Sequence, residues 1–179
     1  MSLRELEAEQ ELAAARARLQ AGARPFRRVA AVESWMAQYQ QERWRYAFLV
    51  LDGPSQMGKT AFARNQTPGG RAFLADCSAC VEPDLRRFNK RDYDMIIYDE
   101  ASCALALRCK RLMQAPPDAV GLGSSPTSMH FYSVIAYKVP MVICSNKWQT
   151  DLEAQTEDDR AWLLANSILV RVIELLWEP

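Results

Sequence analysis

The chain has 179 residues, 49% of them apolar and 25% charged, which are the proportions of an ordinary soluble globular protein. Its 22 basic and 22 acidic side chains cancel, so any contact with nucleic acid has to come from a local basic patch. No apolar run approaches the ~18 residues of a membrane span, and the charged N-terminus shows no signal peptide. The five cysteines are therefore expected to be reduced thiols in an intracellular compartment.

The first 44 residues predict two helices ahead of the main domain. Residues 3–21 favour a surface helix, because Ser2 and Glu5 form a capping-box signature at its start. Its sparse leucines leave open whether it is a solvated extension or a short oligomerisation helix. Residues 31–44 predict a helix that packs on the core through Trp35, Met36, Tyr39 and Trp44. We therefore divide the chain into an N-terminal helical extension (1–24), a packing helix (25–44) and a main domain (45–179).

The main domain begins with the most specific motif in the sequence. Residues 45–52 predict a buried strand, and helix-forming sequence follows at 61–64. Between them the chain fits the phosphate-binding pattern G-x-x-x-x-G-K-[ST] at every fixed position. The residues of this loop are Gly53, Pro54, Ser55, Gln56, Met57, Gly58, Lys59 and Thr60. Strand, loop and helix follow in the order that the motif requires, which favours a phosphate site over a chance glycine-rich turn.

The chemistry of a nucleotide explains the fixed positions of this loop. Glycines let the backbone fold closely around phosphates, so that successive N–H groups point inward. Lys59 would reach the β- and γ-phosphates, and the hydroxyl of Thr60 would take a position on Mg²⁺. The sequence therefore predicts ATP and Mg²⁺ as ligands.

A pair of carboxylates forms the second motif. Residues 93–100 predict a hydrophobic strand that ends in Asp99 and Glu100. The first carboxylate of such a pair can hold a water bound to Mg²⁺, and the second can orient the attacking water. The alternative is an acidic junction that caps the next helix, which is expected at 102–114.

A third polar strand end is Asn146. Residues 129–137 and 139–145 predict two adjoining strands, which we expect to form a hairpin with Lys138 between them. Beside a γ-phosphate, the Asn146 amide could hydrogen-bond both the phosphate and the attacking water. The alternative is an ordinary turn residue, because asparagine is favoured at turns.

Other segments carry weaker signals. The helix at 102–114 is basic, which indicates either a solvated face or a contact with nucleic acid, through Arg108, Lys110 and Arg111. The further expected elements are a strand at 71–76, a helical turn at 83–88, an irregular segment at 118–128, a helix capped by Thr156 and running to about 165, and a strand at 168–174.

Two residue groups are discounted as sites. Cys77-x-x-Cys80 could begin a zinc site with Cys103 and Cys109, but the second spacing is wide and free cysteines are favoured. The single histidine, His130, lies in a strand pattern, so no nucleophile set can be argued from it.

The loop at 53–60, the acids at 99–100 and the strand that ends at Asn146 occur in a characteristic order. This combination resembles the helicase domain of superfamily 3, an AAA+ branch found in replication initiator proteins of circular single-stranded-DNA viruses. The likeness covers roughly residues 45–178 and includes the segments 139–146 and 161–170.

The resemblance implies an ATPase that assembles into a homo-oligomeric ring and moves along single-stranded DNA. Lys59 and Thr60 match Walker A, Asp99 and Glu100 match Walker B, and Asn146 matches the sensor of motif C. The resemblance also implies an arginine finger for a neighbouring subunit after motif C, with Arg160 as the first candidate and Arg171 as the second.

The chain departs from this family in two respects. The initiators usually carry an upstream endonuclease with paired histidines, whereas this chain has one histidine, His130, and only 44 residues before its first predicted strand. Lys138 lies near the expected hairpin tip but out of register with the lysine by which the family contacts DNA.

We therefore expect an α/β P-loop fold of the AAA+ type, with a mostly parallel central sheet flanked by helices. The expected function is Mg²⁺-dependent ATP hydrolysis, coupled to remodelling of single-stranded DNA or RNA, with Lys59, Glu100, Asn146 and Arg160 as catalytic residues. One alternative is a nucleotide-regulated switch or scaffold without translocation. Another is a small-molecule kinase, for which no clear lid is visible.

Overall fold

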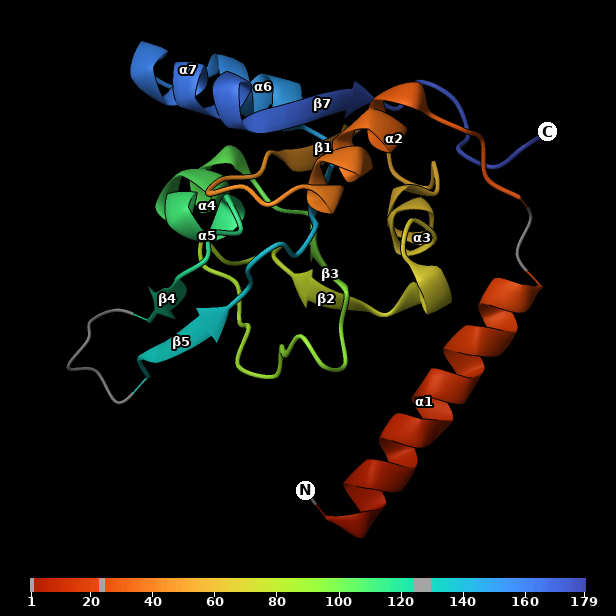
Figure 1. The fold of residues 1–179 in the computed structure, drawn as a ribbon. Helices are drawn as coiled ribbons and strands as arrows, with labels where there is room; N and C mark the ends of the chain where they lie inside the picture. Colours follow the sequence, from red (N-terminus) through yellow and green to blue (C-terminus); the bar gives the residue numbers. More distant parts are fainter. Residues whose placement is uncertain (1, 23–24, 124–129) are drawn as a thin grey trace.

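Five apolar segments form one parallel sheet in the order β2-β3-β6-β1-β7 (Figure 1). The strands are β1 (Phe48–Asp52), β2 (Ala72–Asp76), β3 (Met95–Asp99), β6 (Met141–Ser145) and β7 (Ser167–Arg171). The computed structural model describes residues 2–22, 25–123 and 130–179. The predicted α/β architecture with a mostly parallel central sheet flanked by helices is confirmed.

The three central strands are apolar on both faces because helices cover both. Every residue of β6 is buried, and β1 and β3 are buried up to their final aspartates. Such continuous apolar runs are typical of parallel strands between two helical layers. In the register of the sheet, Asp52 lies opposite Ser145 and Asp76 opposite Asp99, so the polar strand ends share one edge.

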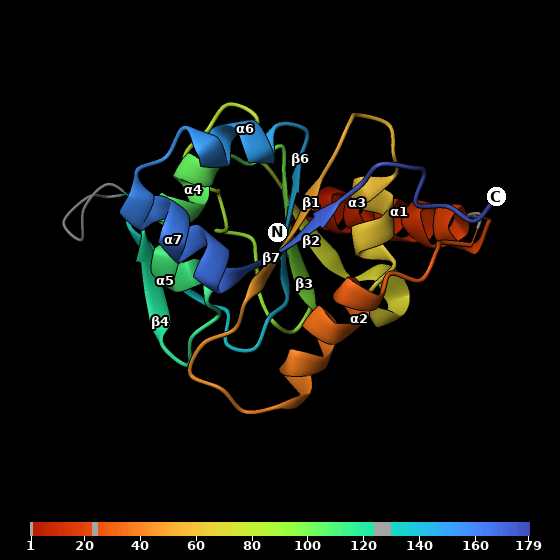
Figure 2. The same cartoon turned by 90° about the horizontal axis from the view of Figure 1, so that it is seen from above.

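Helices lie on both faces of this sheet. Figure 2 shows α2 (Ala30–Ala37) and α3 (Lys59–Arg64) on one side. The opposite side carries α4 (Cys103–Arg108), α5 (Lys110–Met113), α6 (Trp148–Glu153) and α7 (Glu157–Asn166). Short 3₁₀ turns occur at η1 (Gln38–Gln40) and η2 (Pro68–Gly70). Among the described helices, none combines the length and apolar character that a bilayer span requires.

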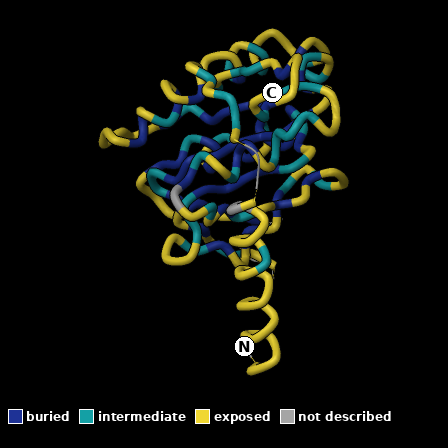
Figure 3. Tube along the Cα trace, turned by 90° about the vertical axis from the view of Figure 1, so that its right-hand side faces the viewer, coloured by how far each residue is buried: buried dark blue, intermediate teal, exposed yellow. Residues whose placement is uncertain are grey.

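The predicted N-terminal helix is confirmed as α1 (Leu3–Ala21). Its capping box is formed, because the Ser2 N–H donates to Glu5 Oε2 (2.7 Å) and the Glu5 N–H donates to Ser2 Oγ (3.3 Å). The helix projects from the body and is exposed along nearly its whole length (Figure 3). Leu12 is 55% exposed and Leu19 75%, so α1 gains little stability from tertiary packing.

The second predicted helix is shorter than expected. α2 and η1 end at Gln40, and Trp44 is 79% exposed, so the assignment of Trp44 to the buried side is wrong. Trp35 and Tyr39 are buried as predicted, and both donate to the carbonyl oxygen of Ala47, at 2.8 and 3.1 Å. This carbonyl lies directly before β1, so the polar tips of the two aromatic side chains anchor the start of the central strand.

The predicted hairpin of residues 129–137 with 139–145 is wrong. β6 lies between β1 and β3 in the parallel sheet, whereas β5 (Tyr132–Ile135) pairs antiparallel with β4 (Ala119–Leu122). β6 is buried throughout and therefore suits the sheet interior, whereas only one residue of β5 is buried. β4 falls within the segment expected to be irregular, of which residues 124–128 lie outside the described part, as does Met129.

The remaining helical predictions have mixed outcomes. The single helix expected at 102–114 is divided into α4 and α5, because the backbone of Cys109 leaves helical geometry (φ −110°, ψ 37°). Residues 83–88 form a non-helical turn in which the Phe88 N–H donates to the Leu85 carbonyl. The cap of α7 is confirmed, because Thr156 Oγ1 accepts from the Asp159 N–H at 3.3 Å.

Candidate functional site

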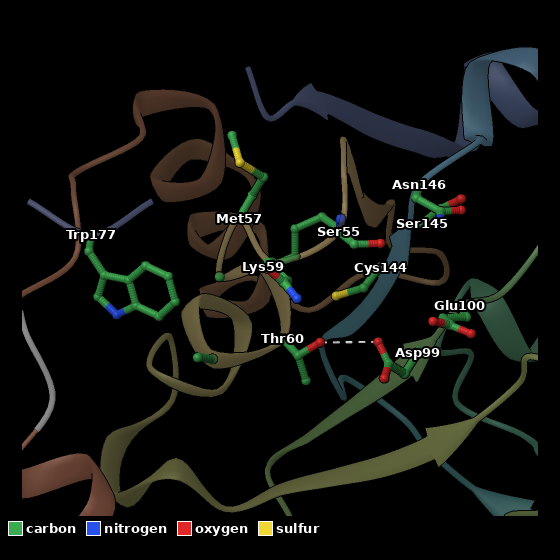
Figure 4. Close-up of a pocket in the computed structure, with 13 residues that line it drawn as sticks. Ser55, Met57, Lys59, Thr60, Asp99, Glu100, Cys144, Ser145, Asn146 and Trp177 are labelled. Atoms are coloured by element: carbon green, nitrogen blue, oxygen red, sulfur yellow. Dashed lines mark hydrogen bonds between the residues drawn. The ribbon is translucent and has the colours of Figure 1, made fainter. Parts of the chain in front are cut away.

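A cavity of about 290 Å³ lies at the carboxyl edge of the sheet. It is lined by residues 55–61, by Asp99 and Glu100 after β3, by residues 144–146 of β6 and its end, and by Trp177 (Figure 4). Four stretches that are far apart in the sequence therefore meet here, three of them where parallel strands end side by side. The predicted loop, acidic pair and strand-end asparagine all face one space.

The loop between β1 and α3 has a backbone suited to anions. Gln56 (φ 64°) and Gly58 (φ 86°) are both left-handed, and such alternation turns successive N–H groups toward a common concavity. The Lys59 ammonium donates to the carbonyl oxygens of Gly53 (2.6 Å) and Pro54 (2.7 Å), across the mouth of the loop. The loop therefore holds a cation at its mouth.

Both glycines of the motif are required by packing as well as by the loop. A Cβ at Gly53 would lie 2.3 Å from the carbonyl oxygen of Val172, because the chain after β7 passes directly over this position. A Cβ at Gly58 would lie 2.8 Å from the Trp177 ring, and the left-handed φ adds strain for any side chain. Packing is therefore in itself a physical reason for glycine at these two positions.

The loop and the acidic pair are joined by one hydrogen bond. Thr60 Oγ1 donates to Asp99 Oδ1 at 3.0 Å, from the first turn of α3 to the end of β3 (Figure 4). Glu100 follows with a left-handed backbone (φ 55°), which costs a non-glycine residue on the order of 1–3 kcal/mol. This conformation turns the chain at the strand end, and Glu100 is exposed on the cavity wall.

The end of β6 supplies the third wall. Asn146 is exposed there, next to Ser145, whose hydroxyl accepts from the Lys147 N–H at 3.2 Å. The carbonyl of Ser145 accepts from the Gly53 N–H at 3.1 Å, so β6 also fixes the start of the loop. Cys144 lines the cavity as well, and burial, with the nearby Asp99 charge as a lesser cause, raises the pKa of its thiol to about 12.

Two further residues of this region were not anticipated from the sequence. Asp52, the last residue of β1, accepts from the N–H groups of Trp148 (3.0 Å) and Gln149 (3.2 Å), and so caps α6 from outside. Trp177 comes from the C-terminal tail and carries no local sequence signal for a site. The aspartate could have been suspected from its place directly before the loop.

The two candidate arginine fingers lie outside the lining of the cavity in the described chain. Arg160 donates to the carbonyl oxygen of Gln155 at 3.0 Å, and its Nε is buried without a partner among the described residues. Arg171 ends β7 opposite Asp52 in the register of the sheet, and it is exposed. Of the two, only Arg171 belongs to the edge at which the cavity lies.

The basic residues of α4 and α5 are ion-paired rather than free. Arg108 pairs with Glu82 (3.5 Å) and Arg111 with Asp118 (3.3 Å). Lys110 pairs with Asp159 (3.5 Å) and lies 5.2 Å from the centre of the Trp162 ring. These contacts reduce the positive field of this surface.

Lys138 is not at a hairpin tip, because the antiparallel ribbon is formed by β4 and β5. It lies in the turn before β6 with φ 62° and pairs with Glu42 at 2.8 Å. His130 lies just before β5 and is exposed. In the parts of the chain that the structure describes, no three His, Cys, Asp or Glu side chains gather in a way that could hold a metal ion.

A search with the sequence matched no protein-family model and no curated protein.

Proposed function

We propose that the protein has a P-loop NTPase fold and is a Mg²⁺-dependent ATPase of the superfamily 3 helicase type. In this proposal the triphosphate lies along the loop, and hydrolysis is coupled to remodelling of single-stranded DNA or RNA. Three separate motifs support it by their convergence on one cavity.

The observation that carries the proposal is the contact between Thr60 and Asp99. The hydroxyl and the carboxylate belong to motifs 39 positions apart in sequence, yet they are 3.0 Å apart in the fold. Both supply oxygen atoms, which are the ligands that Mg²⁺ prefers. Thr60 and Asp99 are thus the residues that would hold Mg²⁺, which when bound neutralises phosphate charge.

Other side chains fit distinct tasks around this pair. Lys59 would exchange its two carbonyl acceptors for phosphate oxygens, which bind an ammonium more strongly because they are charged. Glu100, exposed on the wall, would orient the attacking water, and Asn146 would hydrogen-bond the terminal phosphate and that water. The exposed position of both side chains leaves them accessible to a ligand.

The first test is ATP turnover with Mg²⁺ at low salt, in the presence and absence of single-stranded DNA. We expect Lys59→Ala to lose nucleotide binding, whereas Glu100→Gln keeps binding and loses about 100-fold or more in turnover. Glu9→Gln is a matched control for the second change, because Glu9 is exposed on α1 and does not line the cavity. Undiminished turnover in both site variants would contradict the assignment.

We further propose that the active form is a homo-oligomer in which Arg160 or Arg171 serves a neighbouring subunit. The cavity of a single chain contains neither side chain, and this motivates the proposal. Arg171→Ala or Arg160→Ala should then lower turnover while leaving ATP binding intact. Mixing either variant with the Lys59→Ala protein should restore part of the activity if the arginine acts across subunits.

The second candidate is a nucleotide-regulated switch or scaffold without translocation. The specific observation in its favour is the pairing of Arg108, Lys110 and Arg111 with acidic partners. Under this alternative, nucleotide binds but DNA leaves turnover unchanged. Stimulation by single-stranded DNA that weakens as salt rises would contradict the switch and support the helicase-like function.

A further inference from the structure

The C-terminal tail runs along the phosphate-binding loop. After β7, the Val172 N–H donates to the Asp52 carbonyl (2.7 Å), and farther on the Leu176 N–H donates to the Met57 carbonyl (3.2 Å). The tail therefore follows the loop from its first residues to its middle. Hydrogen bonds to the loop region therefore help to position the tail.

A segment near the N-terminus fastens the tail in this position. The Arg27 N–H donates to the Leu176 carbonyl (2.8 Å), and the Glu178 N–H donates to the Pro25 carbonyl (2.7 Å). These bonds form an isolated antiparallel bridge, Phe26 with Trp177. Arg27 adds an ion pair with Glu174 at 3.1 Å. We refer to residues 25–27 and 174–178 together as the terminal clasp.

The clasp holds the Trp177 indole against the loop. The ring stacks on Phe26, with centroids 5.7 Å apart and planes 25° apart. Its six-membered edge faces Gly58, where an added Cβ would lie 2.8 Å from the ring. Trp177 is only partly buried, and it lines the same cavity as Lys59. A large apolar surface is thus fixed beside the loop rather than buried in the core.

The cavity has two chemically different ends. Figure 4 shows Trp177 on one side of Lys59, and Glu100 and Asn146 on the other. The carboxylate and amide groups suit the reacting phosphate and its attacking water. If the terminal phosphate lies at that end, the extended triphosphate leads back along the loop toward the indole. A nucleoside is the part of the ligand that would reach it.

From this arrangement we infer that Trp177 is the apolar platform against which the nucleoside of the bound nucleotide packs. The inference depends on the proposed function, because it assumes that the loop holds the phosphates. Indole contact with a base depends on the π-face that all bases share, so this platform supplies affinity without selecting one base. Phe26 and the clasp bonds orient the ring in advance, which reduces the entropy lost on binding.

The test compares a non-hydrolysable ATP analogue with inorganic tripolyphosphate, each measured calorimetrically with Mg²⁺. Tripolyphosphate has no nucleoside, so it reports on the loop alone. We expect Trp177→Ala to lower the affinity for the analogue by about 10- to 100-fold and to leave the affinity for tripolyphosphate unchanged. Trp177→Phe should retain most of the affinity because it keeps a ring. Trp44→Ala is the matched control, since Trp44 is 79% exposed and does not line this cavity.

Each other outcome has a distinct meaning. If Trp177→Ala loses the same affinity for both ligands, the indole only supports the loop. If it loses affinity for neither, the nucleoside lies elsewhere. If the wild-type protein binds tripolyphosphate but not the analogue, the inference is also overturned, while the phosphate site remains supported. If the wild-type protein binds neither ligand, or if Lys59→Ala binds both as well as wild type, the proposed function itself fails.

Discussion

The central strand β1 and the helix α1 differ in what holds them in place. β1 is buried on both faces and pairs with β6 and β7, and Asp52 at its end accepts hydrogen bonds from distant residues of α6 and of the tail. α1 has its capping box and its own backbone bonds, and its side chains are largely exposed. A strand of five residues therefore depends on the whole fold, whereas a helix of 19 residues depends mainly on its own sequence.

The comparison is tested most severely by the same substitution in each element. Leu49→Ala in β1, where the side chain is 0% exposed, should lower the free energy of unfolding by about 2–5 kcal/mol. Leu12→Ala in α1, where the side chain is 55% exposed, should change it by less than about 0.5 kcal/mol. Urea unfolding followed by circular dichroism measures both. A large effect of Leu12→Ala would indicate that α1 is buried in an assembly.

The tertiary cap on α6 gives the next largest effect. Asp52→Ala removes both acceptors for the first N–H groups of α6 and should cost about 1–3 kcal/mol. Asp52→Asn keeps one acceptor oxygen and should lose less. Thermal unfolding of the two variants beside wild type would measure this order. Equal stability of all three proteins would mean that the cap contributes nothing.

The contact between the loop and the tail can be separated from backbone strain. Gly58→Ala and Gly69→Ala both place alanine at a left-handed φ, at a cost of about 1 kcal/mol. At Gly58 the new methyl also meets the Trp177 ring at 2.8 Å, whereas at Gly69 the nearest atom is 3.9 Å away. Gly58→Ala should therefore be the less stable variant and should bind nucleotide more weakly. Identical unfolding curves would argue against a tight contact between Trp177 and the loop.

The smallest expected effect is a difference in the rate at which the thiols around the sheet are chemically modified. Burial raises the pKa of Cys103, Cys109 and Cys144 to about 12, so their reactive thiolate forms are scarce at pH 8. Cys80 is less buried, so a thiol reagent should modify it first. In Cys80→Ser this fast phase should be absent. Rapid labelling of Cys144 instead would mean that the cavity opens more widely than the structure shows.

The sequence predicted which residues share the cavity better than it predicted the connections that hold them. The loop, Asp99, Glu100 and Asn146 all follow apolar runs, and the ends of parallel strands share one edge, so these residues could be grouped in advance. Which strands pair with one another could not be predicted in this way. The adjoining strand pattern predicts a hairpin for β6, but its uniformly buried residues belong between two parallel strands.

Long-range hydrogen bonds account for most of what was missed. The residue before α6 provides no capping side chain, and the cap comes from Asp52, 96 positions before Trp148. No local pattern in the sequence therefore indicates the start of this helix. Trp177 reaches the cavity only because the tail bonds to Met57 and to residues 25–27. Such contacts become predictable only when the path of the whole chain is known.

The terminal clasp has a kinetic consequence for the fold. Residues 25–27 and 174–178 pair although Arg27 and Trp177 are 150 positions apart, so breaking the bridge frees both segments from their mutual hydrogen bonds. The amide protons of Arg27 and Glu178, which make the clasp bonds, should therefore exchange with solvent water in one concerted opening rather than independently. The Leu176 amide bonds to Met57 in the loop, so its exchange rate would measure how often the tail separates from the loop beside the cavity.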